Sequence, residues 1–473
     1  MRKALLAVHT AGHFTELVRV ARLLRRSGRY VPTFLFARSY QGIQRDTGIC
    51  REEAISYIED RLRAGGEGDP VPVTAPVPHT GPSGARRWLR GVWSRPPFLL
   101  ALPRALVRQG QELRLARRIM AREQPSLLVL AEDNAGYETA VLIRAAHERR
   151  TPAVVVPFTV ANALEPAEWH FRDPAHHVEG WGNRLTGLLF ARWVHAHRGR
   201  RLLRLPGAQV IAKECWGLAP PIPWQMNSGR ADAIAVESPF MEAYYRREGL
   251  PPDQLVVTGA LADDELAESV RDAPARRDAL CAELGLPPDR RIVLCALPPD
   301  QFALCGSQAD LPDYATLLRV WMETLSALPD CAVVVRLHPR MHVDAFRHIE
   351  AWGVKISQRD TATLVPLCDL FVASVSATIR WAIACGKPVL NYDVYRLGWT
   401  DFADAPGVLR VEDRAAFVAT ADRLARDRAF YDEVRARQAS DAARWGRLDG
   451  LAGRRMLECF ERTKHTDVVE ARA

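Results

Sequence analysis

The chain has 473 residues, of which 48% are hydrophobic and 25% charged, an ordinary balance for a globular protein of about two or three domains. Its formal net charge of +8 indicates an acidic partner, such as nucleotide phosphates or anionic lipid. Nine cysteines without a CxxC pair argue against a disulfide framework or a zinc site, and favour a reducing compartment. The first apolar run, residues 4–8, is too short for a signal peptide, and no run reaches the roughly 18 residues of a membrane span, so we expect a cytoplasmic protein.

The beginning of the chain predicts a doubly wound α/β domain. Residues 4–8 and 31–37 are short apolar runs typical of buried parallel strands, and residues 14–26 between them have one apolar helical face. Gly12 and His13 lie in the turn between the first strand and this helix, at the sheet edge where such domains bind ligands. His13 could contact a phosphate or act as a base; the alternative is a loop histidine that faces solvent.

Three carboxylates follow the next predicted strand, residues 127–130. Glu132, Asp133 and Glu138 stand at or near its carboxyl end, where a side chain can meet a substrate. We expect a general base or a ligand for a sugar hydroxyl among them. The alternative is that one of them caps the following helix.

Two later strands of this domain, residues 233–236 and 255–257, end next to Ser238 and Gly259. We expect both residues to line the same side of the domain as the carboxylates. The acids at 263–265 then begin a helical linker, where the helix dipole favours negative charge, and we assign them no chemistry.

Residues 86–122 are strongly basic, with a single acid, Glu112, and with Trp88, Trp93 and leucines interleaved. This composition is typical of an interfacial membrane helix, in which cations meet anionic headgroups and indoles lie at the boundary. A solvated helix face is the alternative. Nucleic acid is disfavoured as a partner because no fold that binds it is recognisable. The cations are Arg86, Arg87, Arg90, Arg95, Arg104, Arg108, Arg114, Arg117, Arg118 and Arg122.

Residues 160–228 form an insert rich in histidine and tryptophan. His195 and His197 are spaced like metal ligands, but neighbouring arginines repel a cation and no acid or cysteine stands beside them, which disfavours a metal site. We expect a second basic surface that bears tryptophan and that could hold an acceptor or rest on a membrane.

A second α/β domain is predicted over residues 285–440. Its strand 331–335 is followed directly by Arg336 and then His338. An arginine fork matches phosphate oxygens, and an imidazole can donate to the same group. A surface turn without a ligand is the alternative.

A hydroxyl-rich turn follows a later strand of this domain, residues 370–373. Ser374, Ser376 and Thr378 stand where a helix begins, with Arg380 in its first turn. Free backbone N–H groups and the positive helix end favour an anion there, usually a phosphate. Helix capping is the alternative role for the hydroxyls.

The domain boundaries follow from these elements. We expect a first domain over residues 1–272, a second over 285–440, and a C-terminal helix and tail over 441–473. The last two helices are predicted at 414–438 and 440–462.

The order of these motifs resembles that of the GT-B superfamily of nucleotide-sugar glycosyltransferases. The motifs are VTGA before the linker, RLHP in the second half, the Ser-rich turn, and GKPVL after its helix. The resemblance is greatest to bacterial surface-polysaccharide transferases, to glycerophosphotransferases and to non-hydrolysing UDP-N-acetylglucosamine 2-epimerases. It covers roughly residues 1–60, 125–160 and 230–440, and it implies two Rossmann-like domains that face a cleft.

The resemblance also implies roles for individual residues. Side chains of the second domain would bind the donor, and those of the first would line the cleft with the acceptor. The donor phosphates would meet Arg336 and His338, and the pyrophosphate would meet Ser374, Ser376 and Thr378. The donor sugar would lie near Asp393. The residues lining the cleft would be Gly12, His13, Glu138, Ser238 and Gly259.

Two departures from the epimerase pattern argue against epimerase activity. Its Asp-Ser-Gly-Gly followed by paired glutamates is replaced here by residues 374–378 and then Arg380, and its His-Glu-Ala-Gly segment by residues 157–162. No D-x-D occurs in the chain, which disfavours a metal-chelating transferase of the GT-A type.

We therefore predict a metal-independent glycosyltransferase without a cofactor, which uses a nucleotide-sugar donor and a glycan or lipid-linked glycan acceptor in the assembly of surface polysaccharide or a related glycan. Asp133, Glu132 and His13 are the candidate catalytic residues. The protein would be cytoplasmic, or peripheral on the inner face of the cytoplasmic membrane. The alternatives are a nucleotide-sugar 2-epimerase and an inactive protein that binds membrane or glycan.

Overall fold

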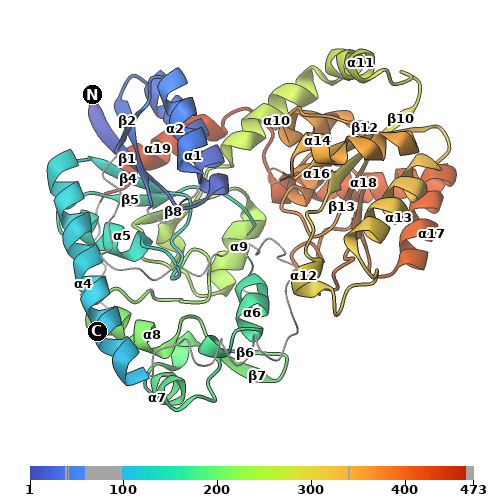
Figure 1. Ribbon diagram of the computed structural model, residues 1–473. Coiled ribbons are helices and arrows are strands. Elements are labelled where there is room, and N and C mark those ends of the chain that lie inside the picture. Colours follow the sequence, from blue (N-terminus) through green and yellow to red (C-terminus); the bar gives the residue numbers. More distant parts are fainter. Residues whose placement is uncertain are drawn as a thin grey trace.

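The computed structural model describes residues 1–37, 40, 42–58, 98–160, 162, 164–338 and 341–464, and contains two parallel sheets (Figure 1). The first has seven strands in the order β3-β2-β1-β4-β5-β8-β9. All of its neighbouring strands run parallel, as buried apolar runs without alternation predict. The strands are β1 (Arg2–Val8), β2 (Tyr30–Phe36), β3 (Ser56–Ile58), β4 (Leu127–Leu130), β5 (Ala153–Val155), β8 (Ala233–Val236) and β9 (Leu255–Val257).

Helices cover both faces of this sheet. One face packs against α1, whose buried side chains Leu17, Val20 and Leu24 lie on one stripe of the helix. The other face packs against α4, α5 and α9. The helices are α1 (Ala11–Arg26), α2 (Ile43–Glu52), α4 (Phe98–Glu123), α5 (Thr139–His147) and α9 (Pro239–Arg247).

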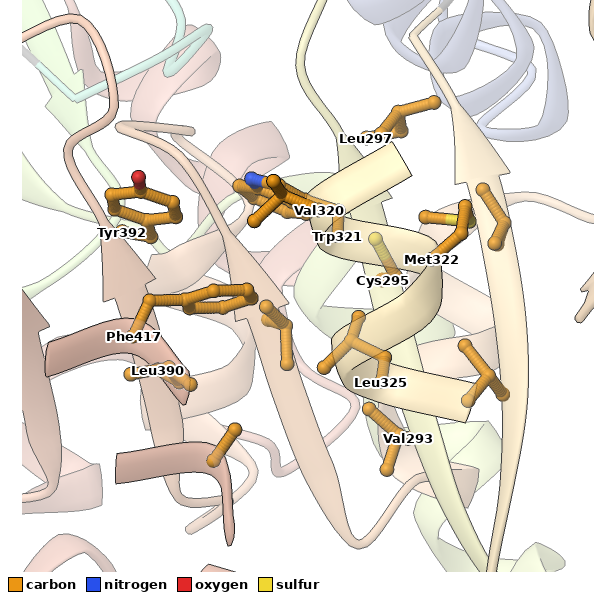
Figure 2. Packing of buried hydrophobic residues seen from close by; sticks show 14 of the residues in the cluster. Val293, Cys295, Leu297, Val320, Trp321, Met322, Leu325, Leu390, Tyr392 and Phe417 are labelled. Atoms are coloured by element: carbon orange, nitrogen blue, oxygen red, sulfur yellow. The ribbon is translucent and has the colours of Figure 1, made fainter. Parts of the chain in front are cut away.

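The second sheet has six parallel strands in the order β12-β11-β10-β13-β14-β15. Its core holds an aromatic stack in which Trp321 of α13 (Tyr314–Ser326) and Phe417 of α17 (Arg414–Arg426) lie 5.9 and 4.7 Å from the ring of Tyr392 (Figure 2). The strands are β10 (Arg291–Leu297), β11 (Cys331–Leu337), β12 (Lys355–Ile356), β13 (Leu370–Ala373), β14 (Val389–Tyr392) and β15 (Val408–Val411). Together the two sheets confirm the predicted doubly wound α/β architecture.

The chain passes between the domains twice. It leaves the first sheet through α10 (Leu261–Arg271) and α11 (Ala273–Leu284), and it returns after α18 (Arg428–Trp445). The last helix, α19 (Ala452–Arg462), lies beside α1 and β1 in Figure 1 and completes the core of the first domain with Phe460.

The helix predictions at 414–438 and 440–462 are wrong in their boundaries. Asp427 interrupts the first, because its side chain accepts a hydrogen bond from the backbone N–H of Phe430 and so caps a new helix, α18. The second is interrupted at Gly446, where the backbone becomes extended before α19 begins.

The insert between β5 and β8 is a small subdomain of its own. It contains an antiparallel hairpin, which packs with short helices around the buried side chain of Trp193. None of the described helices is long and apolar enough to cross a membrane. The elements of the insert are α6 (Leu164–Phe171), α7 (Trp181–Leu189), β6 (Val194–His197), β7 (Arg200–Leu203) and α8 (Gly207–Cys215).

Candidate active site

Both sheets reverse their strand order at one point. In the first sheet the chain runs outwards through β1, β2 and β3, then returns to place β4 on the other side of β1. In the second sheet β10, β11 and β12 run one way, and β13 returns to the other side of β10. At such a switch point the two connections diverge, and the carboxyl edge of the sheet can receive a ligand. Several of the predicted site residues follow these strands.

His13 and Glu132 meet at the switch point of the first sheet. Thr10 caps α1 by accepting a hydrogen bond from the backbone N–H of His13, which places that histidine in the first turn. Its Nε2 lies 2.6 Å from Oε1 of Glu132, and Asn134 donates to Oε2 over 3.1 Å. Burial acts to raise the pKa of Glu132, but the charge of His13 and the hydrogen bonds from His13 and Asn134 outweigh it and hold the pKa below its ordinary value.

This pair leaves one nitrogen of His13 for chemistry. When the imidazole is neutral, a carboxylate at Nε2 favours the tautomer with its proton on that atom, which leaves the lone pair on Nδ1. Nδ1 has no hydrogen-bond partner among the described residues. The rings of Phe158 and Tyr137 lie 5.0 and 5.6 Å from that of His13, which is 1% exposed. A substrate therefore reaches Nδ1 only when a neighbouring side chain moves.

His9, which follows β1 directly, is a second buried histidine at this site. Burial and the nearby charge of His13 lower the pKa of His9 to about 3, so its ring is neutral. Its Nε2 lies 3.7 Å from Oε2 of Glu138, and its ring lies 5.1 Å from that of Tyr137. The sequence prediction did not single out His9 or Tyr137; two histidines four residues apart at a strand end were the available signal.

The insert supports the Glu132–His13 pair through Arg204. This buried guanidinium donates to Oδ1 of Asn134 over 2.8 Å and lies 2.7 Å from Nε2 of His170. His170 is kept neutral, since burial, His176 and Arg204 lower its pKa to about 2. The contacts thus run from the insert through Arg204 and Asn134 to Glu132 and His13. Among the described residues no three His, Cys, Asp or Glu side chains gather as a metal ion would require.

Asp133 turns away from this pair. Its Oδ2 accepts a hydrogen bond of 2.6 Å from the backbone N–H of Arg230, and its carbonyl accepts one from Ser228. Burial raises the pKa of Asp133 to about 6, with the hydrogen bond and charge of Arg230 acting against the shift. These two hydrogen bonds hold the segment before β8 in place.

Three other predicted residues of the first domain have packing roles. Gly12 lies under Phe158, whose ring would be 2.6 Å from a Cβ at that position. Ser238 caps α9 by accepting from the backbone N–H of Met241. Gly259 adopts φ +82° where the chain leaves the sheet, and a Cβ there would meet Ala452 of the returning chain at 2.9 Å.

Glu237, which the sequence prediction passed over, ends β8 as a buried acid. Its Oε1 has no hydrogen-bond partner among the described residues. Burial raises the pKa of Glu237 to about 7, and the charge of Arg380 acts against this shift. It therefore lies within the electrostatic reach of the second domain.

In the second domain, two of the buried polar atoms that lack a partner among the described residues belong to predicted donor-site residues. Arg336 ends β11 with Nη1 donating to the carbonyl of Leu337, while its Nε has no partner among the described residues. Ser374 follows β13, and its buried Oγ likewise has none. Burial lowers the pKa of Arg336, and the negative charge of Asp360 acts against this shift. His338 is half-buried at the end of the same strand.

The hydroxyl turn is shaped by its own contacts. Val375 adopts φ +44° and donates its backbone N–H to Oδ1 of Asn391 over 3.0 Å. The hydroxyls of Ser376 and Thr378 lie 2.8 Å apart, and the backbone N–H of Thr378 donates to Ser376. The helix that follows, α16 (Ile379–Ala384), is short. The turn is therefore fixed before any ligand binds.

Two side chains near this turn are already paired. Arg380, in the first turn of α16, adds no free charge to the hydroxyl turn, since its guanidinium is buried and bound to Asp263 over 2.7 Å. Asp393 accepts from the backbone N–H groups of Leu397 and Gly398 and pairs with Arg410 at 3.0 Å. Its carboxylate thus shapes the loop after β14.

Polar contacts join the two domains on two sides. On one side Arg19 of α1 binds Glu265 of α10 at 2.9 Å and Asp360 at 3.2 Å. On the other side, the insert reaches the second domain. There Arg198 donates to Gln308 over 2.8 Å, and Asn162 donates to Asp401 over 2.8 Å.

Solved structures with a similar fold exist, but the sequence comparisons find no match. No model of a protein family and no curated protein sequence matches the chain. Among solved structures, UDP-GlcNAc 2-epimerase from Neisseria meningitidis bound to UDP-GlcNAc has a TM-score of 0.52 at 12% identity, covering 97% of this chain and 100% of that one. The glycosyltransferase of kitacinnamycin has a TM-score of 0.54 at 13% identity, covering 98% and 99%. The calicheamicin glycosyltransferase CalG4 has a TM-score of 0.51 at 14% identity, covering 97% and 98%.

These likenesses extend over almost the whole chain and over both sheets. The protein therefore has the GT-B fold, in which two Rossmann-like domains are arranged as in glycosyltransferases and 2-epimerases. Identities of this size establish the fold alone and not the activity.

Proposed function

We propose that the protein is a nucleotide-sugar glycosyltransferase in which His13 is the general base. The observation that carries the proposal is the 2.6 Å contact between His13 and Glu132, which leaves Nδ1 as the basic atom. This base stands at the switch point of the first sheet, while groups that suit a phosphate stand at the edge of the second. Such a division suits a donor on one domain and an acceptor on the other.

In the proposed step, Nδ1 of His13 takes the proton of an acceptor hydroxyl. The oxygen attacks the anomeric carbon of the donor sugar, and the bond from that carbon to the phosphate oxygen breaks. The electron pair of that bond leaves with the nucleotide. Glu132 stabilises the imidazolium that forms, as a carboxylate does in other histidine-dependent enzymes.

The leaving nucleotide gains negative charge, which the second domain is built to accept. Arg336 and Ser374 supply buried donors without partners among the described residues, and His338 directly follows the strand that holds Arg336. β10 lies between β11 and β13, so the two groups are separated by two strand spacings, roughly 10 Å. A nucleotide with its phosphates and sugar can reach across that width. Preorganised donors of this kind stabilise the transition state without a metal ion.

The fold is shared with 2-epimerases, and the site residues favour transfer. The turn after β13 has no carboxylate, and Arg380, the first charged residue beyond it, is neutralised by Asp263. A glycan or lipid-linked glycan is the acceptor that we propose.

The proposal is tested by incubating the purified chain with UDP-, GDP-, CDP- and CMP-sugars that carry a mass label, with and without a pool of glycan and lipid-linked acceptors. We expect one nucleotide to raise the unfolding temperature and the labelled sugar to appear on an acceptor. Absence of binding and of transfer for every donor would sink the proposal. An epimerised sugar formed without an acceptor would replace it with the epimerase activity.

Matched variants locate the donor site. Ser374→Ala is expected to weaken nucleotide binding about tenfold, the loss of one hydrogen bond to a charged group. Its control, Ser440→Ala, removes an exposed hydroxyl of α18 that bonds only to its own helix. Equal effects of the two variants would remove Ser374 from the site.

A further inference from the structure

One helix of the insert, α7, is packed with its apolar face outwards. Its buried positions include the small residues Gly182, Thr186 and Gly187. Its large apolar residues point to solvent: Trp181, Leu185, Leu188 and Leu189 are 59%, 45%, 70% and 63% exposed. A helix that only covered a core would bury these side chains. The exposed face of α7 is thus built to contact something outside the described chain.

The beginning of α4 extends the same surface. Phe98 lies 5.1 Å from Trp181, edge to face, and its ring would overlap a Cβ at Gly182, so the two helices are in close contact. On α4, Leu99 and Leu100 are exposed, and Val107 follows two turns later.

Trp216, at the end of α8, joins this surface from a third helix. Its indole donates to the carbonyl of Leu106 over 2.9 Å and packs over Gly110. Of the twelve large apolar residues that are exposed in the described chain, eight lie here: Leu99, Leu100, Val107, Trp181, Leu185, Leu188, Leu189 and Trp216. We call these eight residues the α4–α7 surface.

Most of the charges around the α4–α7 surface are positive. No acid occurs in residues 98–111 of α4 or in α7, while Arg104, Arg108, Arg184 and Arg192 are exposed on or beside these helices. Among the described residues, acids stand only at the edges: Glu112 and Glu214, which pair with Arg108 and Arg192, and Glu179 before α7. Two copies of the surface face to face would bring these cations together, which disfavours self-association through it. An anionic bilayer offers apolar depth for leucine and tryptophan and negative headgroups for arginine.

We infer that the α4–α7 surface docks on an anionic lipid membrane. The contact goes beyond the proposed function, since it requires only binding and no catalysis. It unites two segments that the sequence suggested separately, the basic region 86–122 and the insert; residues 86–97 of that region lie outside the described residues. In Figure 1, α7 lies at the end of the first domain far from α10 and α11, the helices through which the chain passes to the second domain.

Vesicle flotation tests the inference with the full-length protein. Vesicles of phosphatidylcholine with phosphatidylglycerol are expected to carry the protein to the top of the gradient at low salt. Vesicles of phosphatidylcholine alone, or high salt, are expected to reduce the bound fraction severalfold, because exposed charges are screened. No binding to the anionic vesicles would overturn the inference.

Variants distinguish binding through the α4–α7 surface from non-specific adsorption to vesicles. The double variant Leu188→Gln and Leu189→Gln is expected to lower the bound fraction at least about tenfold, because two apolar side chains lose their burial in lipid. Both positions are exposed, so the unfolding temperature should stay that of the wild type. The control, Val418→Gln, changes an exposed residue of α17 in the second domain and is expected to bind like the wild type.

Two results of these variants would count against a membrane. If the double variant floats as the wild type does, the contact lies elsewhere on the protein. If the wild type forms dimers in sedimentation that the double variant abolishes, a second copy of the chain covers the surface instead. A label on Cys215, the exposed cysteine next to Trp216, provides a further check, since its fluorescence should shift to the blue on anionic vesicles.

Discussion

At the scale of single residues, the choice of base depends on what each carboxylate already contacts. Glu132 and Asp133 are neighbours in sequence and both are buried, yet only Glu132 meets a histidine. Asp133 is bound to the backbone N–H of Arg230. The two neighbours thus have different partners beyond the end of β4.

Replacing His13 with Gln should slow sugar transfer without weakening the binding of the donor nucleotide. We expect the rate constant to fall about 10²- to 10⁴-fold, the usual contribution of a general base. Nucleotide binding should be unchanged, because His13 belongs to the first domain and the predicted donor groups to the second. Single-turnover kinetics and calorimetric titration measure the two quantities. His195→Gln, in the hairpin of the insert, is the control, and full activity of His13→Gln would contradict this assignment.

The sequence could indicate which strand ends hold chemistry, but not which side chains join. His13 and Glu132 were each predicted, since polar residues after apolar strands are visible in one dimension. Their pairing depends on β1 and β4 being neighbours, a property of the sheet order. Arg204 was missed because its partner, Asn134, is 70 residues away and no pattern connects the two.

At the scale of elements, the insert acts on the site through one strand end. Arg204 follows β7 and holds Asn134, which in turn donates to Glu132. The hairpin therefore positions a residue of the proposed active site through Asn134.

Arg204→Met should reduce activity by roughly 10- to 100-fold, the equivalent of a charge-assisted hydrogen bond. The pH profile of the rate should shift as well, because Asn134 is released and Glu132 loses order, whereas a merely structural loss would leave the profile in place. Arg201→Met is the matched control, since Arg201 is exposed on the same strand. Identical pH profiles for Arg204→Met and the wild type would argue against positioning.

The packing of helix α19 on the first domain is a second feature that the sequence pattern does not predict. Its apolar face was predicted as part of one long C-terminal helix, but nothing in the pattern shows that it packs on the first domain. Helical periodicity identifies a face to be buried, and not the surface that buries it.

Phe460→Ala should therefore destabilise the first domain. The side chain is 3% exposed, and removing a buried phenylalanine typically costs about 3–5 kcal/mol. Calorimetry should show an earlier transition for the first domain, while the transition of the second stays in place. Leu451→Ala, at an exposed position just before α19, should change neither transition. Equal shifts of both transitions would mean that the domains unfold as one unit.

At the scale of the whole molecule, one buried acid and two half-buried acids lie where the two domains meet. Burial raises the pKa values of Glu16, Glu237 and Asp401 to about 7 in each case. In the unfolded chain such groups titrate near 4. At these three groups the folded state thus binds more protons between these values, and their contribution to stability falls as the pH rises from about 4 to about 7.

Glu237→Gln should remove part of this dependence. The variant is expected to gain roughly 1–3 kcal/mol over the wild type at pH values above about 7, and little below about 4.5, because glutamine carries no charge to bury. Urea unfolding across this range measures the difference. Glu433→Gln, an exposed position of α18, should give a flat difference, and the same flat result for Glu237→Gln would contradict the assignment.

The second crossing of the chain has a consequence for synthesis. The first sheet is synthesised before the second domain, but the helix that completes its core, α19, follows the second domain in the chain. The first domain therefore begins to emerge before the second and is completed after it. Until then the apolar face that Phe460 covers is exposed, and a nascent chain halted before α19 presents it to chaperones.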